Sequence, residues 1–97
     1  MSPIAIVATI EVKPEFRQEF LDYVNNGLIA KSRAEAGNIQ YDLHRSMENE
    51  NLFVMIENWS GSAAIEEHNA SEHFQAFVAF VQGKLVSLDI KQLKIVN

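Results

Sequence analysis

The chain has no cysteine, two prolines, four glycines and no long hydrophobic run. Without cysteine it can form no disulfide framework, no thiolate nucleophile and no cysteine-based metal or iron–sulfur site. None of its apolar stretches approaches the ~20 residues that a membrane helix needs. Its start also lacks the basic region and the cleavable apolar segment of a signal peptide. We therefore expect a cytoplasmic protein with no membrane partner.

Positive charge is also scarce, because eight Lys and Arg residues stand against thirteen Asp and Glu, giving a net charge of −5. With no basic stripe to neutralise phosphates, we expect no nucleic-acid partner. The four glycines are dispersed, so there is no Gly-rich phosphate loop. A hydrophobic content of 47% and a charged content of 22% are ordinary for a globular protein. At 97 residues, we expect the whole of 1–97 to form one domain.

Apolar side chains recur at strand or helix spacing along most of the chain. Alternating segments predict four strands, over residues 4–12, 39–46, 52–59 and 88–96. Helical spacing predicts a helix from Pro14 to about Ala36, a short helix over 63–68 and another that starts at Ser71. The apolar positions expected in this last helix are Phe74, Phe77, Val78, Val81 and Leu85. Inside the first helix, Asn26 and Gly27 predict a local distortion.

The order β-α-β-β-α-β is that of a ferredoxin-like α+β fold with an antiparallel sheet. The first and third strands are apolar on both faces, which predicts that they are central. Both helices should cover the same face, since crossover connections are right-handed. We expect the other face to be left bare while carrying five aliphatic or alanine positions of the first strand, namely Ile4, Ile6, Ala8, Ile10 and Val12. A bare apolar face indicates an interface, so the sequence predicts a homodimer in which two sheets form an α/β barrel.

Three segments of the chain resemble motifs of one family. They are EAGNIQYDLHR at 35–45, FVMIENW at 53–59 and HNASEHF at 68–74. In order, they resemble the patterns E-x-G-x-x-x-Y-x-L-x-R/x, F-x-x-x-E-x-W and H-x-x-S-x-H-F of the antibiotic biosynthesis monooxygenase (ABM) domains. The resemblance covers nearly the whole chain. It implies a homodimeric α/β barrel and, from characterised members, cofactor-free oxygenation of quinols or polyketide phenols. Relatives include an isomerase of a phosphorylated autoinducer and haem-degrading oxygenases, so the fold alone does not fix the reaction.

Cofactor-free oxygenation needs an electron-rich substrate and O2 in a dry pocket with a proton acceptor. Trp59 is the candidate for the wall, with an indole N–H for a substrate oxygen; the alternative is a core aromatic. Glu57 shares a strand face with apolar side chains, and burial would raise its pKa; the alternative is a structural salt bridge. His68 matches the family's helix histidine and is the candidate base; the alternative is a capping or hydrogen-bonded histidine. Further candidates for substrate binding are Tyr41, His44, Phe53, Met55, His73 and Phe77.

A metal is not expected, because His68 and His73 do not have the i, i+4 spacing that places two ligands on one helical face. Haem-degrading relatives depend on an asparagine in the first strand and a histidine in the last helix. The corresponding segments here read VAT at 7–9 and FVAF at 77–80. We therefore expect no haem and no other cofactor.

Three functions remain open. The first is a monooxygenase of the ABM type, with a small aromatic substrate and O2 as its partners. The second is an isomerase of a small oxygenated metabolite in the same pocket. The third is a dimer that binds a ligand without catalysis.

Overall fold

The computed structural model describes residues 2–97. The strands are β1 (Ile4–Val12), β2 (Asn38–Arg45), β3 (Leu52–Trp59) and β4 (Leu85–Lys94). The α-helices are α1 (Arg17–Tyr23), α2 (Ile29–Arg33), α3 (Ser62–Ala70) and α4 (Glu72–Phe80). A 3-10 turn, η1 (Pro14–Phe16), precedes α1, and a wide π-helical turn, η2 (Val24–Leu28), joins α1 to α2.

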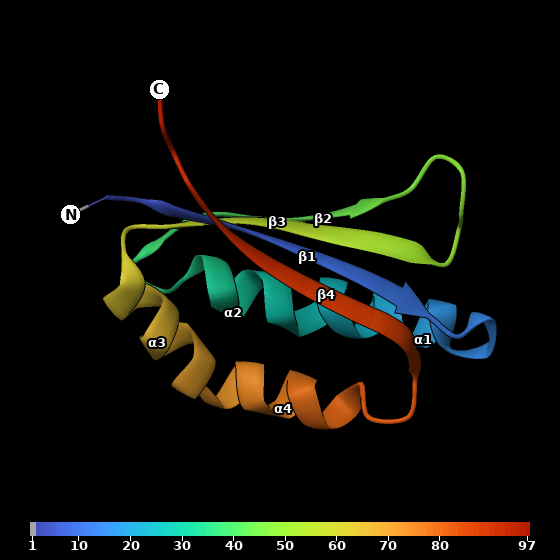
Figure 1. Ribbon diagram of the computed structural model, residues 1–97. Helices are drawn as coiled ribbons and strands as arrows, with labels where there is room; N and C mark the ends of the chain where they lie inside the picture. Colours follow the sequence, from blue (N-terminus) through green and yellow to red (C-terminus); the bar gives the residue numbers. More distant parts are fainter. Residues whose placement is uncertain (1) are drawn as a thin grey trace.

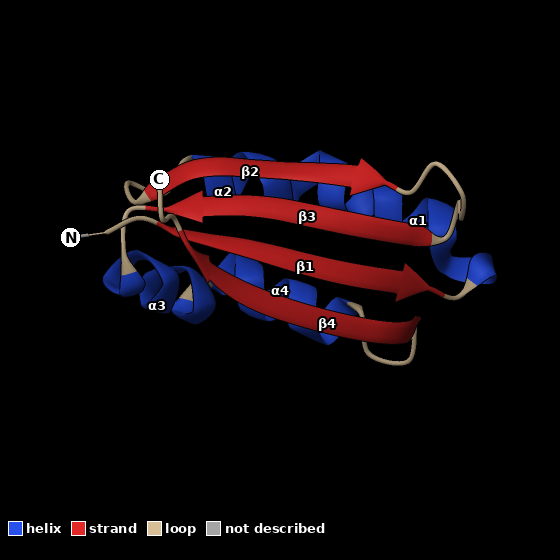
Figure 2. Cartoon of the chain, turned by 45° about the horizontal axis from the view of Figure 1, so that its top comes forward, coloured by secondary structure: helices blue, strands red, loops and turns tan. Residues whose placement is uncertain are grey.

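The four strands form one antiparallel sheet in the order β2-β3-β1-β4 (Figure 2). All the helices lie on one side of this sheet (Figure 1). The fold is therefore α+β and ferredoxin-like, as predicted, with β1 and β3 in the centre. Among the described residues, no helix is long and apolar enough to cross a membrane.

The structure corrects which face of β1 is covered. Ile6, Ala8, Ile10 and Val12 are buried beneath the helices and do not lie on the uncovered face. Both faces of this strand are apolar, so alternation alone could not tell them apart. The side with three β-branched residues buries more apolar area and therefore takes the helix side. The uncovered face carries smaller or partly buried side chains of the two central strands, including Ala5, Val7, Thr9, Leu52, Val54 and Ile56.

The first helix is distorted where Asn26 and Gly27 predicted it, within η2. Four buried side chains recur every fourth residue along this segment: Phe20, Val24, Leu28 and Ser32. In a regular α-helix every fourth position drifts by about 40° around the axis. A wider turn takes up part of this drift, so that all four side chains reach the core. The helical segment ends at Arg33 and not near Ala36 as predicted.

The boundary between the last helix and the last strand also differs from the prediction. Helix α4 begins as expected, with the Ser71 hydroxyl accepting a hydrogen bond from the Phe74 backbone N–H at 3.2 Å. It ends at Phe80, and β4 starts at Leu85, three residues before the predicted start. Leu85 therefore belongs to the strand and not to the helical stripe. The chain turns at Gly83, whose φ of 77° is in the left-handed region that favours glycine.

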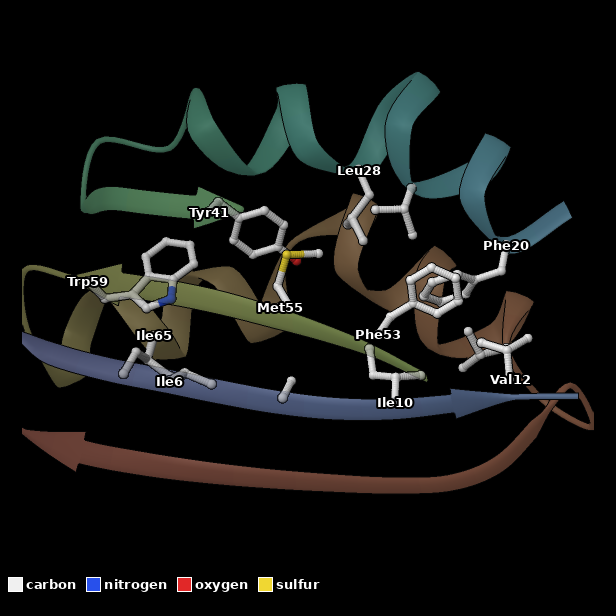
Figure 3. Close-up of a cluster of buried hydrophobic side chains, with 13 residues drawn as sticks. Ile6, Ile10, Val12, Phe20, Leu28, Tyr41, Phe53, Met55, Trp59 and Ile65 are labelled. Carbon is white, nitrogen blue, oxygen red and sulfur yellow. The ribbon is translucent and has the colours of Figure 1, made fainter. Parts of the chain in front are cut away.

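The core lies between the sheet and the helices, where large side chains of β3 meet those of the first helical segment (Figure 3). Phe53 and Trp59 of β3 and Phe20 of α1 are among the largest fully buried side chains. The rings of Phe20 and Phe53 lie 5.1 Å apart between centroids. This packing leaves one part of the space between sheet and helices unfilled, beside Tyr41 and Met55.

Candidate functional site

The unfilled space is a cavity of about 310 Å³ between the sheet and the pair α3 and α4. Its walls are mostly apolar and include Ile6, Met55, Phe77, Leu88 and Ile90. Three polar side chains gather at one part of it: Tyr41, Glu57 and His68. Tyr41 and Glu57 are register partners on β2 and β3, and the rings of Tyr41 and His68 are 5.5 Å apart. A mostly apolar cavity with a few converging polar groups is the usual form of a small-molecule site.

A close contact between Gly37 and α3 places His68. A Cβ atom on Gly37 would collide with the Cβ of Ala64, so only glycine lets the helix approach this turn. The backbone N–H of Ser60 also donates to the Gly37 carbonyl at 2.9 Å. His68 follows Ala64 by one helical turn and shares its face. The approach therefore carries His68 to Glu35, which lies two residues before Gly37.

Glu35 is hydrogen-bonded to two histidines through one carboxylate oxygen, Oε2. His68 Nδ1 lies 2.6 Å from this oxygen, and His73 Nε2 lies 2.8 Å from it. A carboxylate only accepts hydrogen bonds, so His68 carries a proton on Nδ1. In neutral His68 the lone pair is then on Nε2, which is buried and has no hydrogen-bond partner among residues 2–97. His68 therefore combines a place in the lining of the cavity with a buried ring nitrogen that has no partner among the described residues.

The environment of His68 favours its neutral form. Burial lowers its pKa, because only 2% of the residue is exposed and the charged ring would lose hydration. The Glu35 carboxylate opposes this shift through its hydrogen bond and its charge, and His73 adds to the lowering. The net pKa is below the ordinary value. His68 is therefore neutral and able to accept a proton at neutral pH.

Glu57 is buried next to His68 and has the opposite shift. Burial raises its pKa to about 7, with a further increase from the charge of Glu35. The Trp59 indole N–H donates to Glu57 Oε1 at 2.9 Å and partly offsets the shift. Near neutral pH, the Glu57 carboxyl is thus divided between its protonated and ionised forms. Burial and the Glu57 charge also raise the pKa of Tyr41 above its usual range, so its hydroxyl stays a proton-bearing hydrogen-bond donor.

Glu35, His68 and His73 are also residue types that hold metal ions, and one ligand atom of each lies within 4.8 Å of the others. Ligands of a tetrahedral zinc, each about 2.0–2.1 Å from the ion, stand roughly 3.3 Å apart. The imidazole nitrogens are closer to the Glu35 oxygen than this, at 2.6 and 2.8 Å. The distances therefore favour hydrogen bonds between the three side chains. That the protein uses no metal or other cofactor stays a prediction.

Five of the nine candidate residues line the cavity: Tyr41, Met55, Glu57, His68 and Phe77. The cavity lining does not include the other four, which are His44, Phe53, Trp59 and His73. His44 is exposed on the uncovered face of the sheet, where its Nδ1 is 3.3 Å from the Val54 carbonyl. Phe53 is a core side chain packed on Phe20. Trp59 and His73 lie next to the cavity and contact the residues that line it.

Trp59 has a different position from the wall that the sequence predicted. It is fully buried behind the cavity lining, and its ring is 4.6 Å from that of His68 between centroids. Its indole N–H is engaged by Glu57 and is not free for a substrate oxygen. Trp59 is therefore the core aromatic of the alternative interpretation, and its N–H positions Glu57, which forms no salt bridge among residues 2–97. Figure 3 shows the indole beside the Tyr41 ring, beneath the first helical segment.

Glu35 was not among the candidates, although it begins the first of the three motifs. It lies in a turn without periodicity, and its partners follow 33 and 38 residues later in the sequence. One signal could have found it: a histidine on the buried face of a helix needs a partner for Nδ1, and a carboxylate is the common choice.

The fold and the cavity define a small α+β domain with a mostly apolar cavity lined by a buried histidine and a buried carboxyl. Residues 3–79 match the model of the family described as antibiotic biosynthesis monooxygenase. The chain belongs to this family, which confirms the resemblance found in the sequence.

Relatives cover most of the chain. It is 51% identical over 76 residues to "Putative monooxygenase YcnE" of Bacillus subtilis (strain 168), an alignment that covers 78% of this chain and 79% of that protein. It is 33% identical over 86 residues to the similarly named Rv0793 of Mycobacterium tuberculosis, covering 89% and 82% of the two chains. The crystal structure of PA3566 from Pseudomonas aeruginosa superposes with a TM-score of 0.93 at 37% identity, covering 100% of this chain and 97% of that one.

Proposed function

We propose that the protein is a cofactor-independent monooxygenase that acts on a quinol or a polyketide-type phenol. The observation that carries the proposal is the buried, unpartnered Nε2 of His68, a residue that lines a mostly apolar cavity. Membership of the ABM family and the names of its relatives support the type of reaction. A cytoplasmic location stays part of this proposal.

The first chemical step is proton transfer from a phenolic hydroxyl of the substrate to His68 Nε2. Glu35 holds the ring in the correct tautomer and stabilises the imidazolium that forms, as the carboxylate does in a catalytic triad. The substrate ring lies against apolar walls such as Met55 and Phe77. The protonated carboxyl of Glu57 or the hydroxyl of Tyr41 donates a hydrogen bond to a substrate oxygen.

The phenolate is electron-rich enough to reduce O2 directly. A bond forms between a ring carbon and one oxygen atom, the O–O bond breaks, and the second oxygen atom leaves as water. A hydroquinone and O2 thus give a hydroxyquinone and water, with all four electrons supplied by the substrate. Overall no proton is gained or lost, since the proton taken by His68 is balanced by one returned when water leaves.

Oxygen uptake with a panel of hydroquinones and phenols of one to three rings tests the proposal. A monooxygenase consumes O2 without releasing hydrogen peroxide, whereas autoxidation releases peroxide, so both are measured. Consumption no faster than the enzyme-free rate for every compound would contradict the proposal. Conversion of a compound without O2 would instead support the isomerase, which could use the same pair of His68 as base and Glu57 as acid.

The variant His68→Gln tests whether His68 is the catalytic base. It removes the proton acceptor while keeping a polar side chain of similar reach, and kcat should fall by about 10²–10⁴-fold. The matched control is Glu67→Gln, an exposed neighbour on α3 that touches none of the site. Equal rates for His68→Gln and the control would remove His68 from the mechanism.

The proposal includes a homodimer. The uncovered sheet face carries Val7, Leu52, Val54 and Ile56, and helices of the same chain shield only the other face. A second sheet packed on this face would exclude water from it.

A further inference from the structure

Outside the cavity, a second hollow lies between the first helical segment and α4. We call it the outer hollow; its lining includes Glu19, Asp22, Tyr23, Lys31 and His73. His73 thus borders the outer hollow, while His68 borders the cavity. Glu35 touches both histidines. One carboxylate therefore joins a side chain of the cavity to a side chain that faces outward.

The two histidines compete for the same charge. Both point a nitrogen at Glu35 Oε2, and their ring centroids are 5.9 Å apart. The carboxylate carries one negative charge and can neutralise one imidazolium. A second positive charge at this distance would be repelled by the first, and most strongly where the site is buried.

We propose that Glu35 holds one imidazolium at a time and thereby exchanges protons between the cavity and the outer hollow. When His68 takes a proton from the cavity, His73 releases one to the outer hollow. When the cavity needs a proton back, His73 is protonated from outside and His68 gives its proton up. Glu35 and His73 are in this sense positioning residues, which act through His68.

The two histidines have different surroundings. The outer hollow has carboxylates of Glu19 and Asp22 on α1 and one ammonium, Lys31, on α2. On its own helix, His73 follows Glu72. The groups that face His68 are Glu57 and Tyr41, besides Glu35 and His73. His68 is also the more deeply buried of the two rings, with 3% of its side chain exposed against 17% for His73. His73 is therefore the ring with more access to water and to the acidic side chains of the outer hollow.

The catalytic use of this exchange rests on the proposed function. Ionising a phenol in a mostly apolar cavity requires a place for its proton, and forming water later requires a proton. The exchange supplies both through Glu35, and over one turnover the proton that left is balanced by the one that returns.

The test is a histidine NMR titration of the free protein, with ¹⁵N-labelled imidazoles, and it needs no substrate. The variant His73→Gln keeps an N–H donor for Glu35 but cannot become charged, so the midpoint of His68 should rise by about one unit. The matched control His44→Gln, on the uncovered face, should leave that midpoint unchanged. An unchanged His68 midpoint in His73→Gln would overturn the proposal.

Two further measurements separate this proposal from neighbouring ones. With a substrate, His73→Gln should shift the acid limb of the kcat profile to higher pH by the same amount as the NMR midpoint; an unshifted limb would overturn the catalytic use. NMR coupling without any oxygen uptake would count against the proposed function and leave the exchange intact. Tight binding of Zn²⁺ to the purified protein, with loss of the coupled titration in the metal-free form, would overturn the exchange in favour of a metal site.

Discussion

Glu57 and His68 are both buried at the cavity, and burial moves their pKa values in opposite directions. Burial disfavours the charged form of each, so the acid is harder to ionise and the base is harder to protonate. The result near neutral pH is a neutral base beside a partly protonated acid. That combination suits proton transfer within one cavity.

The raised pKa of Glu57 predicts that this residue costs stability at high pH. Below pH 4.5 the carboxyl is protonated in the folded and the unfolded chain; above about 7 it is ionised in both, and only the folded chain bears the cost. The cost therefore appears as pH rises from 4.5 to 7. Glu57→Gln keeps an acceptor for the Trp59 indole and should stabilise the protein by about 1–3 kcal/mol at pH 8 and little at pH 4.5. Urea unfolding at both values checks this, and an equal effect at both would contradict it.

The pH profile of turnover should be bell-shaped. Activity rises as His68 loses its proton, with a midpoint below the ordinary histidine value of 6.5, and falls as Glu57 ionises near 7. The variant Trp59→Phe removes the N–H that stabilises the Glu57 carboxylate, so the falling limb should move to higher pH. The rising limb, which belongs to His68, is the internal control. A falling limb that stays in place would show that Glu57 is not the acid.

At the scale of elements, the approach of α3 to the turn before β2 sets the Glu35 to His68 distance. Gly37→Ala would place a methyl group against Ala64 and should destabilise the fold by about 1–3 kcal/mol. It should also weaken the hydrogen bond between His68 and Glu35, seen as a shift of the His68 Nδ1 resonance. Adding Ala64→Gly should restore both measurements in part, because it removes the colliding atom. A double-mutant cycle without such coupling would contradict this account.

The same substitution at Gly27 should have the opposite effect. A Cβ there meets no atom within 4 Å, and the backbone does not need the left-handed region. Gly27→Ala should therefore stabilise the protein by about 0.5–1 kcal/mol, by reducing the freedom of the unfolded chain. Thermal or urea unfolding of Gly27→Ala and Gly37→Ala, each compared with the wild type, measures the two changes in stability. Destabilisation by both variants would contradict this prediction.

The order of elements could be predicted because each long segment repeats its pattern several times. Alternation in 39–46 and helical spacing around Phe20 each leave one interpretation. The exact ends were harder: Leu85 fits a helical stripe as well as a strand, and only the turn at Gly83 separates the two. The prediction of which face of β1 the helices cover was also wrong. Both faces are apolar, and the choice depends on which of them buries the larger apolar area.

The site was predictable in part for a related reason. Glu57 is a polar residue on an otherwise apolar strand face, which is a signal within the sequence, and His68 was found because it matches the family's helix histidine. The partner of Trp59 is Glu57, two residues before it on the same strand face, where alternation places them together. The partner of His68 is Glu35, 33 residues earlier, and no local periodicity encodes that meeting.

At the scale of the whole molecule, the uncovered sheet face predicts self-association. Val54 lies at its centre, between Thr9 of β1 and His44 of β2. Val54→Lys would place a charge in a dry interface and should convert a dimer into single chains at micromolar concentration. Ile39→Lys, an equal change at an exposed residue of β2, should leave the dimer intact. Sedimentation velocity distinguishes the two; a wild type that sediments as a single chain would disprove the dimer.

The pairing of β1 with β4 has a consequence for how the protein folds during its synthesis. Ile4 pairs with Lys94 and Val12 with Leu85. During synthesis β1 is therefore made long before β4, the strand that pairs with it. Until then one edge of β1 is unpaired, and β4 has not yet supplied Leu88 and Ile90 to the cavity. Until residues 85–94 have been synthesised, the chain therefore has no complete cavity. The edge of β1 that β4 will occupy stays unpaired and can associate with other chains. The pairing of β4 with β1 therefore both completes the cavity for a ligand and removes an edge prone to aggregation.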